Sequence, residues 1–222
     1  MMLLTNVDEV AIPTCATRLA EVPSVSHLRV FEEAPSDTTI RQTFTSVRQA
    51  MYASKFNLSV KDMRVVCNSI DHRLLMLVQT IPRGDIASPL LIAVQLFMAL
   101  IVRETELRCV MVESIVPRLK ASLEPFMTCA TLPKQEYWCG LTWSLWIGVV
   151  TTIPHTEKWE WFYQRLTYLV QKLGILDCVQ FKTVMQRFLW DDFRCETAFK
   201  NHGPTFLWQT RQEATADETG AK

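Results

Sequence analysis

The stretch QEYWCGLTWSLWIGVVTTI, residues 135–153, is apolar on almost every side when it is wound as a helix. A helix without a polar face must be surrounded by other elements. Gly140 and Gly148 are eight residues apart and so lie near one face, where a neighbouring helix could approach closely, although each glycine costs about 1 kcal/mol of helix propensity. We therefore expect 135–153 to be the central and most buried helix of the fold.

Two amphipathic helices are expected after it. Pro154 ends the central helix, Thr156 can cap the next one, and Gly174 is well placed as the left-handed residue that stops it. Asp177 is a good N-cap for the last helix. The helical period is kept by Trp159, Phe162, Leu166, Leu169, Val170 and Leu173 in the first helix, and by Cys178, Phe181, Val184, Met185, Phe188 and Leu189 in the second.

Further helices precede the central one. The first follows residue 36, with Ile40, Phe44, Val47 and Met51 at spacings of three and four. In the second, Ser59 and Asp62 resemble a capping box, and Pro82 and Gly84 end the helix.

The third and fourth helices are expected on either side of residue 104. Ser88 as N-cap and Pro89 at the first helical position open the third helix, which runs to about 103. Its apolar run at 86–102 is marginal for a bilayer, so a buried core helix is the better interpretation. No membrane partner is expected, and a peripheral membrane role stays open as an alternative. The fourth covers roughly 106–123, before a loop bracketed by Pro125 and Pro133.

The period is 3.6 throughout, without an alternating strand or an internal repeat. This predicts an all-α fold: a single-domain helical bundle with antiparallel helix pairs around the central apolar helix. Residues 1–35 read as an irregular N-terminal arm, 36–208 as the helical domain and 209–222 as a polar disordered tail.

Composition excludes some classes of function. The chain has 23 basic and 23 acidic residues and no basic run, so direct binding to nucleic acid is not expected. Its start has no basic region before an apolar stretch and does not read as a secretory signal. The seven cysteines lack CxxC pairs and are expected to be reduced thiols, mostly buried. They stand at positions 15, 67, 109, 129, 139, 178 and 195.

No catalytic, cofactor-binding or metal-binding residue is assigned. Phosphate-binding loops and hydrolase or metalloprotease motifs are absent from the sequence. The four histidines, His27, His72, His155 and His202, stand alone, and a surface role is favoured for His72 over a catalytic one. Cys195 and His202 are seven residues apart and could share a metal, but without a second pair of ligands this is weak evidence.

The stretch QRFLWDDFRCE, residues 186–196, offers a choice between a catalytic carboxylate pair and a helix end. Neighbouring aspartates on a helix point about 100° apart, so Asp191 and Asp192 do not easily converge on one substrate atom. We interpret them as solvated acids beyond a buried helix end. Trp190 lies opposite the apolar stripe, so either the helix has ended there or another segment covers its far side, for which residues 206–208 are the candidate.

The tryptophans could line a ligand-binding pocket or fill the core. Five of them fall in the two helices around Pro154, and core packing is the favoured interpretation. These five are Trp138, Trp143, Trp146, Trp159 and Trp161. A pocket lined by them stays open as an alternative.

The order of segments suggests a family. PLLIAVQLFMALIVRE, LTWSLWIGVVTT, WFYQRLTYLVQKLGI, VMQRFLWDDFRC and GPTFLW follow one another between residues 89 and 208. Over roughly 60–208 this series resembles the C-terminal regulatory region of fungal-specific transcription factors of the binuclear zinc-cluster type. The resemblance implies a non-enzymatic domain that regulates transcription through protein partners, in the nucleus or alternatively the cytoplasm.

The chain departs from that family in two ways. The C-x2-C-x6-C spacing of the zinc-cluster DNA-binding module is absent, and the acidic pair that often follows LW is missing after Trp208. The resemblance therefore implies the regulatory part only, without direct DNA contact. Self-association and binding of a small-molecule effector are both compatible with it. The alternative is a small-molecule-binding or enzymatic helical protein with an aromatic-lined pocket.

Overall fold

The computed structural model describes residues 37–55, 60–82, 84–103, 109–128, 135–191 and 194–202, and within these ranges every regular element is a helix. The all-α prediction is confirmed. The elements are α1 (Asp37–Lys55), α2 (Val60–Thr80), α3 (Ala87–Phe97), the π-helical turn η4 (Met98–Val102), α4 (Val110–Thr128), α5 (Gln135–Val150), α6 (Glu157–Lys172), α7 (Cys178–Gln186) and α8 (Arg194–His202). The N-terminal arm, residues 203–208 and the tail lie outside the described residues.

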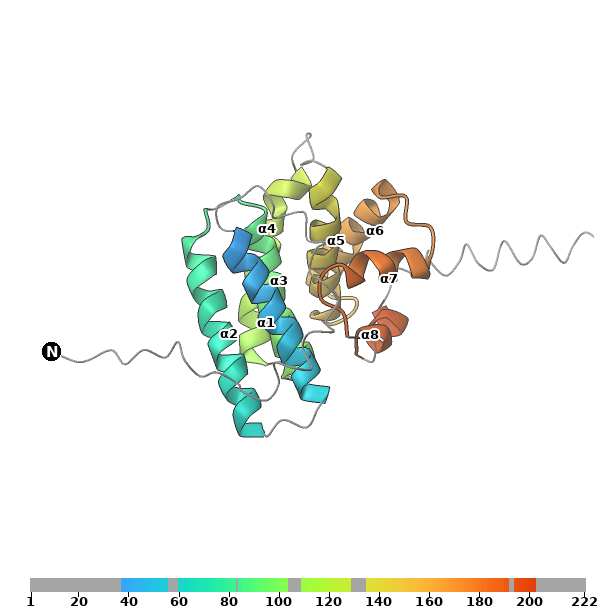
Figure 1. Cartoon of the computed structure of the whole chain (residues 1–222). Coiled ribbons are helices and arrows are strands. Elements are labelled where there is room, and N and C mark those ends of the chain that lie inside the picture. The colour runs from blue at the N-terminus through green and yellow to red at the C-terminus, as the bar shows by residue number, and fades with distance from the viewer. Residues whose placement is uncertain are drawn as a thin grey trace, which may run out of the picture.

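The helices form a bundle around α5. This helix packs against α3, α4, α6, α7 and α8, and residues 140–149 are all buried. Figure 1 shows α1 to α4 on one side of α5 and α6 to α8 on the other, with α1 and α2 running in opposite directions. Consecutive helices pack as pairs, α1 with α2, α3 with α4 and α5 with α6. One continuous apolar core joins them.

The expectation that α5 is the most buried helix is wrong, because α3 is buried more completely. Every residue of α3 except Ser88 is buried, whereas Tyr137, Trp138 and Val150 of α5 are half-buried. α3 is enclosed by α2, α4 and α5, while the ends of α5 reach the edge of the bundle (Figure 1). The two helices together form the centre of the fold.

The helix ends after Pro154 follow the sequence closely. The hydroxyl of Thr156 accepts the amide of Trp159 at 3.3 Å, and the carboxylate of Asp177 accepts the amide of Gln180 at 2.8 Å. Gly174 has φ +64°, as a left-handed stop requires. Its amide donates to Gln171 and the next amide donates to Val170, the paired bonds of a Schellman motif.

Two boundaries differ from the prediction. α3 begins at Ala87, with Ile86 and not Ser88 at the N-cap position, and the carboxylate of Asp85 accepts the amide of Ala87 at 2.8 Å. α4 continues to Thr128 and contains Pro125, which was expected in the following loop. A proline inside a helix leaves the carbonyl four residues earlier without its donor, here that of Ala121. Ala121 is exposed, so water can bond this carbonyl and the helix continues. The predicted Ser59 cap lies outside the described residues.

The two glycines of α5 admit close neighbours, but on different faces. A Cβ added at Gly148 would lie 2.3 Å from the ring of Phe162 on α6. One added at Gly140 would lie 3.2 Å from Leu90 on α3. The close approach is confirmed, whereas the shared face is wrong, because eight residues advance about 80° beyond two full turns.

Candidate functional sites

The segment after α7 is a packed chain reversal. α7 ends at Gln186, and the chain then turns so that Phe188 and Leu189 enter the core. The indole N–H of Trp143 donates to the Leu189 carbonyl at 3.0 Å. From the other side, the guanidinium of Arg48 on α1 donates to the carbonyls of Phe188 at 2.6 Å and Arg187 at 3.1 Å. This reversal fastens the C-terminal helices to α1 and α5.

Asp191 is buried, which corrects the prediction that it is a solvated acid. Its side chain is enclosed where the chain enters α8. The backbone amide of Asp191 donates to the sulfur of Cys195 at 3.3 Å, and its carbonyl accepts the amide of Cys195 at 2.9 Å. The reversal therefore draws Asp191 inward, while Asp192 lies outside the described residues. The pair is not presented together to solvent.

Two tryptophans of α5 fill the core. Trp143 is fully enclosed and contacts Phe44, Phe97 and Phe188, with ring centroids 5.7 to 6.2 Å apart. Trp146 is also enclosed. The expectation of core packing is confirmed for these two. Trp159 is buried and stacks on Tyr163 at 4.5 Å, whereas Trp138 and Trp161 are half-buried.

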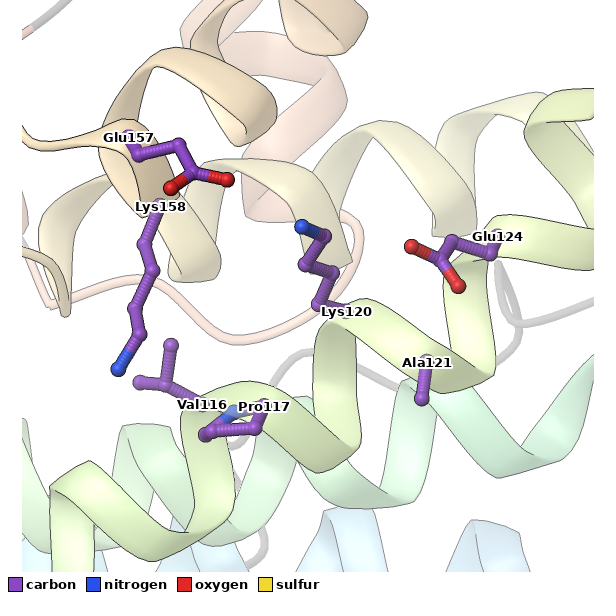
Figure 2. Close-up of a pocket in the computed structure, with 7 residues that line it drawn as sticks. All are labelled: Val116, Pro117, Lys120, Ala121, Glu124, Glu157 and Lys158. Carbon is purple, nitrogen blue, oxygen red and sulfur yellow. The ribbon is translucent and has the colours of Figure 1, made fainter.

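A groove of about 330 Å³ lies between α4 and α6. Figure 2 shows its lining side chains, with Lys120 and Glu124 from α4 facing Glu157 and Lys158 from α6. Val116, Pro117 and Ala121 complete the lining. The volume is at the lower end of small-molecule sites, but such sites are mostly apolar and enclosed. This groove carries charges of both signs and contains no histidine, cysteine or hydroxyl nucleophile.

Two cationic side chains beside this groove contact the ring of Trp161. The guanidinium of Arg165 lies over its ring at 4.1 Å, and the ammonium of Lys120 at 5.4 Å. Burial lowers the pKa of Arg165, and the nearby Glu124 carboxylate opposes this change. Cations held on an indole face gain about 0.5 to 1 kcal/mol at exposed sites. The arrangement holds these cationic side chains in place over the indole.

A polar cluster joins α2 to the chain after η4. The guanidinium of Arg103 forms an ion pair with Asp71 and lies 3.4 Å from the side-chain oxygen of Asn68. Burial raises the pKa of Asp71, while Arg103 opposes the rise through its charge and hydrogen bond. Burial likewise raises the pKa of the Cys67 thiol. A thiol with a raised pKa is a poor nucleophile, and the ion pair of Arg103 with Asp71 ties α2 to the chain after η4.

Replacing Arg103 with Met is expected to raise the pKa of Asp71 further, because burial would then act without the opposing cation. The folded-state pKa lies above the unfolded one, so the stability that Asp71 contributes is present at low pH. It is lost as the pH rises through the interval between the two values. A carbon-13 NMR titration of the carboxyl group measures the change. Arg118→Met, at an exposed position of α4, is the control, and an unchanged or lower pKa in Arg103→Met would contradict the prediction.

The two histidines whose side chains the structure describes, His72 and His155, lie on different elements. His72 is exposed on α2, which agrees with the surface role expected for it. His155 is exposed in the turn between α5 and α6, where its φ is +62°, and its ring lies 5.4 Å from that of Trp159. His27 and the side chain of His202 lie outside the described residues.

The proposed metal pair gains no further ligand. Among the described residues, no three His, Cys, Asp or Glu side chains are arranged to hold a metal ion. Cys195 and His202 belong to one helix and are separated by about 10 Å of helical rise, whereas zinc ligands on one helix are normally four to six positions apart. Cys67, Cys109, Cys139, Cys178 and Cys195 are free thiols, two of them buried and three half-buried.

Purified protein is therefore expected to contain no stoichiometric zinc. A metal that is part of the folded state stabilises it, so chelation should leave the melting temperature unchanged if none is bound. Elemental analysis and a thermal melt with and without chelator test this. One tightly held zinc per chain would overturn the interpretation of Cys195 and His202 as residues that bind no metal.

The chain matches no protein-family model, no curated protein and no solved structure. The resemblance to fungal transcription factors accordingly depends on the order of its segments alone. Within the described ranges, no helix has the length and apolar character needed to cross a bilayer.

Proposed function

We propose that this chain is a non-enzymatic helical interaction domain that regulates transcription through protein partners, without contacting DNA itself. The observation that carries the proposal is an exposed stripe on α2, the outer helix opposite α7 and α8 in Figure 1. Val65, Ser69, His72 and Met76 recur at spacings of three and four and are all exposed. Val65 and Met76 expose 55 % and 51 % of their surface. Exposure of this apolar surface to water is unfavourable, and a partner protein could cover it.

The stripe has the spacing of a helix that fits into a groove of another protein. Its two apolar residues are eleven positions apart and nearly eclipsed on the helical wheel, with His72 between them. Leu75, exposed by 48 %, widens the apolar surface on one side. The balanced charge of the chain, 23 basic and 23 acidic residues, favours protein partners over nucleic acid. The nucleus is the proposed location, with the cytoplasm as the alternative.

A reporter assay tests the regulatory proposal. The whole chain is fused to an unrelated DNA-binding domain in fungal cells, and transcription of a reporter is measured. We expect the fusion to change reporter output severalfold, and Val65→Asp with Met76→Asp to abolish the change without lowering the protein level. Val179→Asp, which is 74 % exposed on α7, is the matched control. An inactive wild-type fusion, or an effect that survives the double substitution, would count against the proposal.

The second candidate function is small-molecule binding, and the groove between α4 and α6 is the observation that favours it. Its volume of about 330 Å³ is sufficient for a small metabolite. A thermal-shift screen would detect binding as a saturable rise in melting temperature. Lys120→Ala should remove that rise if the ligand occupies this groove.

A further inference from the structure

The helix α8 is a short element docked on an aromatic surface. It has nine residues, whereas isolated helices of fewer than about 12 are marginal in water. Among its described side chains, Cys195 and Phe199 are buried and four positions apart, while Thr197 and Lys200 are exposed. A helix with a few apolar anchors on one face is what helix-binding grooves accept. The helical state of α8 therefore depends on the surface beneath it.

That surface holds Phe199 among three aromatic rings from different elements. Phe199 stacks on Phe181 of α7 at 5.0 Å and meets the edge of Trp146 of α5 at 5.6 Å. Trp190, from the chain reversal, lies 6.5 Å away. Trp146 and Phe181 also contact each other at 5.7 Å, so two walls of the site are already packed together. The Phe199 side chain thus occupies a socket built by other parts of the chain.

Charge fixes the orientation of α8 over this socket. Lys182 of α7 pairs with Glu196 of α8 at 3.0 Å, and both side chains remain partly exposed. The same ammonium lies 5.9 Å from the centre of the Trp190 ring. Ion pairs of this exposure add little stability but discriminate between partners of opposite charge. The contact pattern is that of a recognition site, with an aromatic anchor and a charged rim.

One polar atom at the socket has no partner. The indole N–H of Trp190 is buried and makes no hydrogen bond to the described residues. Leaving a buried donor unpaired is unfavourable. A helix that placed an oxygen near this nitrogen would satisfy the donor and bind the same surface better.

We propose that α8 is a displaceable internal ligand, and that the socket formed by Trp146, Phe181 and Trp190 binds an amphipathic helix of a partner protein. The partner helix carries a small residue and an aromatic residue four positions apart, an acid facing Lys182, and a hydrogen-bond acceptor for Trp190. This site is separate from the stripe on α2 and does not depend on it. Because α8 is tethered, it competes at an effective concentration in the millimolar range, which keeps the socket closed to weaker helices.

Binding of a synthetic α8 helix from solution tests the proposal. The probe is a fluorescent peptide RCETAFKNH, residues 194–202, added to the full chain, with binding followed by fluorescence anisotropy. Phe199→Ala in the chain should empty the socket and tighten peptide binding by about tenfold or more relative to wild type. Thr197→Ala, on the exposed side of α8, is the matched control and should bind the peptide as wild type does.

The charged rim gives a second arm. Lys182→Glu combined with Phe199→Ala in the chain should weaken binding of the peptide, and Glu196→Lys in the peptide should restore it. Either of two results would show that α8 is a fixed part of the core. In one, the peptide binds Phe199→Ala no more tightly than wild type, and in the other its affinity is unchanged by the charge reversal. If Phe199→Ala fails to fold, hydrogen exchange of the wild-type chain decides. Amides of α8 that exchange much faster than those of α5 and α7 support displacement, and equal rates overturn it.

Discussion

Trp143→Ala is expected to lower the free energy of unfolding by about 3 to 5 kcal/mol, the range for large aromatic residues removed from a core. Trp143 is fully enclosed at the meeting point of α1, α3, α5 and the reversal after α7. Its removal leaves a cavity bordered by Phe44, Phe97 and Phe188, which rigid helices cannot close. It also leaves the buried Leu189 carbonyl without the indole donor.

Two further variants separate these contributions, with urea denaturation as the measurement. Trp143→Phe keeps most of the ring but lacks the N–H, so it should cost about 1 to 3 kcal/mol, the penalty of an unpaired buried group. Trp161→Ala is the comparison, because that indole is half-buried, meets Phe162 edge-on at 5.1 Å and contacts Arg165 and Lys120 at the surface. It should cost less, about 1 to 2 kcal/mol, because only part of its apolar surface is buried. A loss for Trp143→Ala no larger than that of Trp161→Ala would mean that Trp143 is misplaced.

The sequence predicts those features of the fold that depend on local patterns. Thr156, Asp177 and Gly174 act as foreseen because a cap or a left-handed stop involves residues within four or five positions. The buried stripe of α1, with Ile40, Phe44, Val47 and Met51, follows in the same way from helical periodicity. Such signals are contained in one segment and need no knowledge of its neighbours.

Features that depend on contacts between distant segments could not be predicted from the sequence. Arg48 reads as an ordinary polar residue of an amphipathic helix, yet it hydrogen-bonds to carbonyls about 140 positions away. Asp191 reads as a surface acid until the reversal after α7 turns it inward. Pro125 normally breaks a helix, but an exposed position lets water bond the freed carbonyl. The socket beneath α8 belongs to the same class, since its rings come from three elements.

Gly148→Ala is expected to cost about 3 kcal/mol, the upper part of the usual range for overpacking a core. A Cβ at this position would lie 2.3, 2.5 and 2.7 Å from three atoms of the Phe162 ring, closer than real Cβ contacts allow. Phe162 is fully buried on α6 and cannot swing into solvent. Either the ring leaves its rotamer or α6 moves away from α5. The change opposes the roughly 1 kcal/mol that alanine gains over glycine in a helix.

Gly140→Ala is the matched control, since the nearest atom to its added Cβ is 3.2 Å away and belongs to the flexible end of the Leu90 side chain. This substitution should change the free energy of unfolding by less than about 1 kcal/mol. A double-mutant cycle then identifies the cause. Phe162→Ala alone should cost about 3 to 5 kcal/mol through its cavity. In that background Gly148→Ala should cost nothing further, because the ring that it meets is gone. If the two losses add instead, the cost of Gly148→Ala arises elsewhere, and the close packing of α6 on α5 is not set by this glycine.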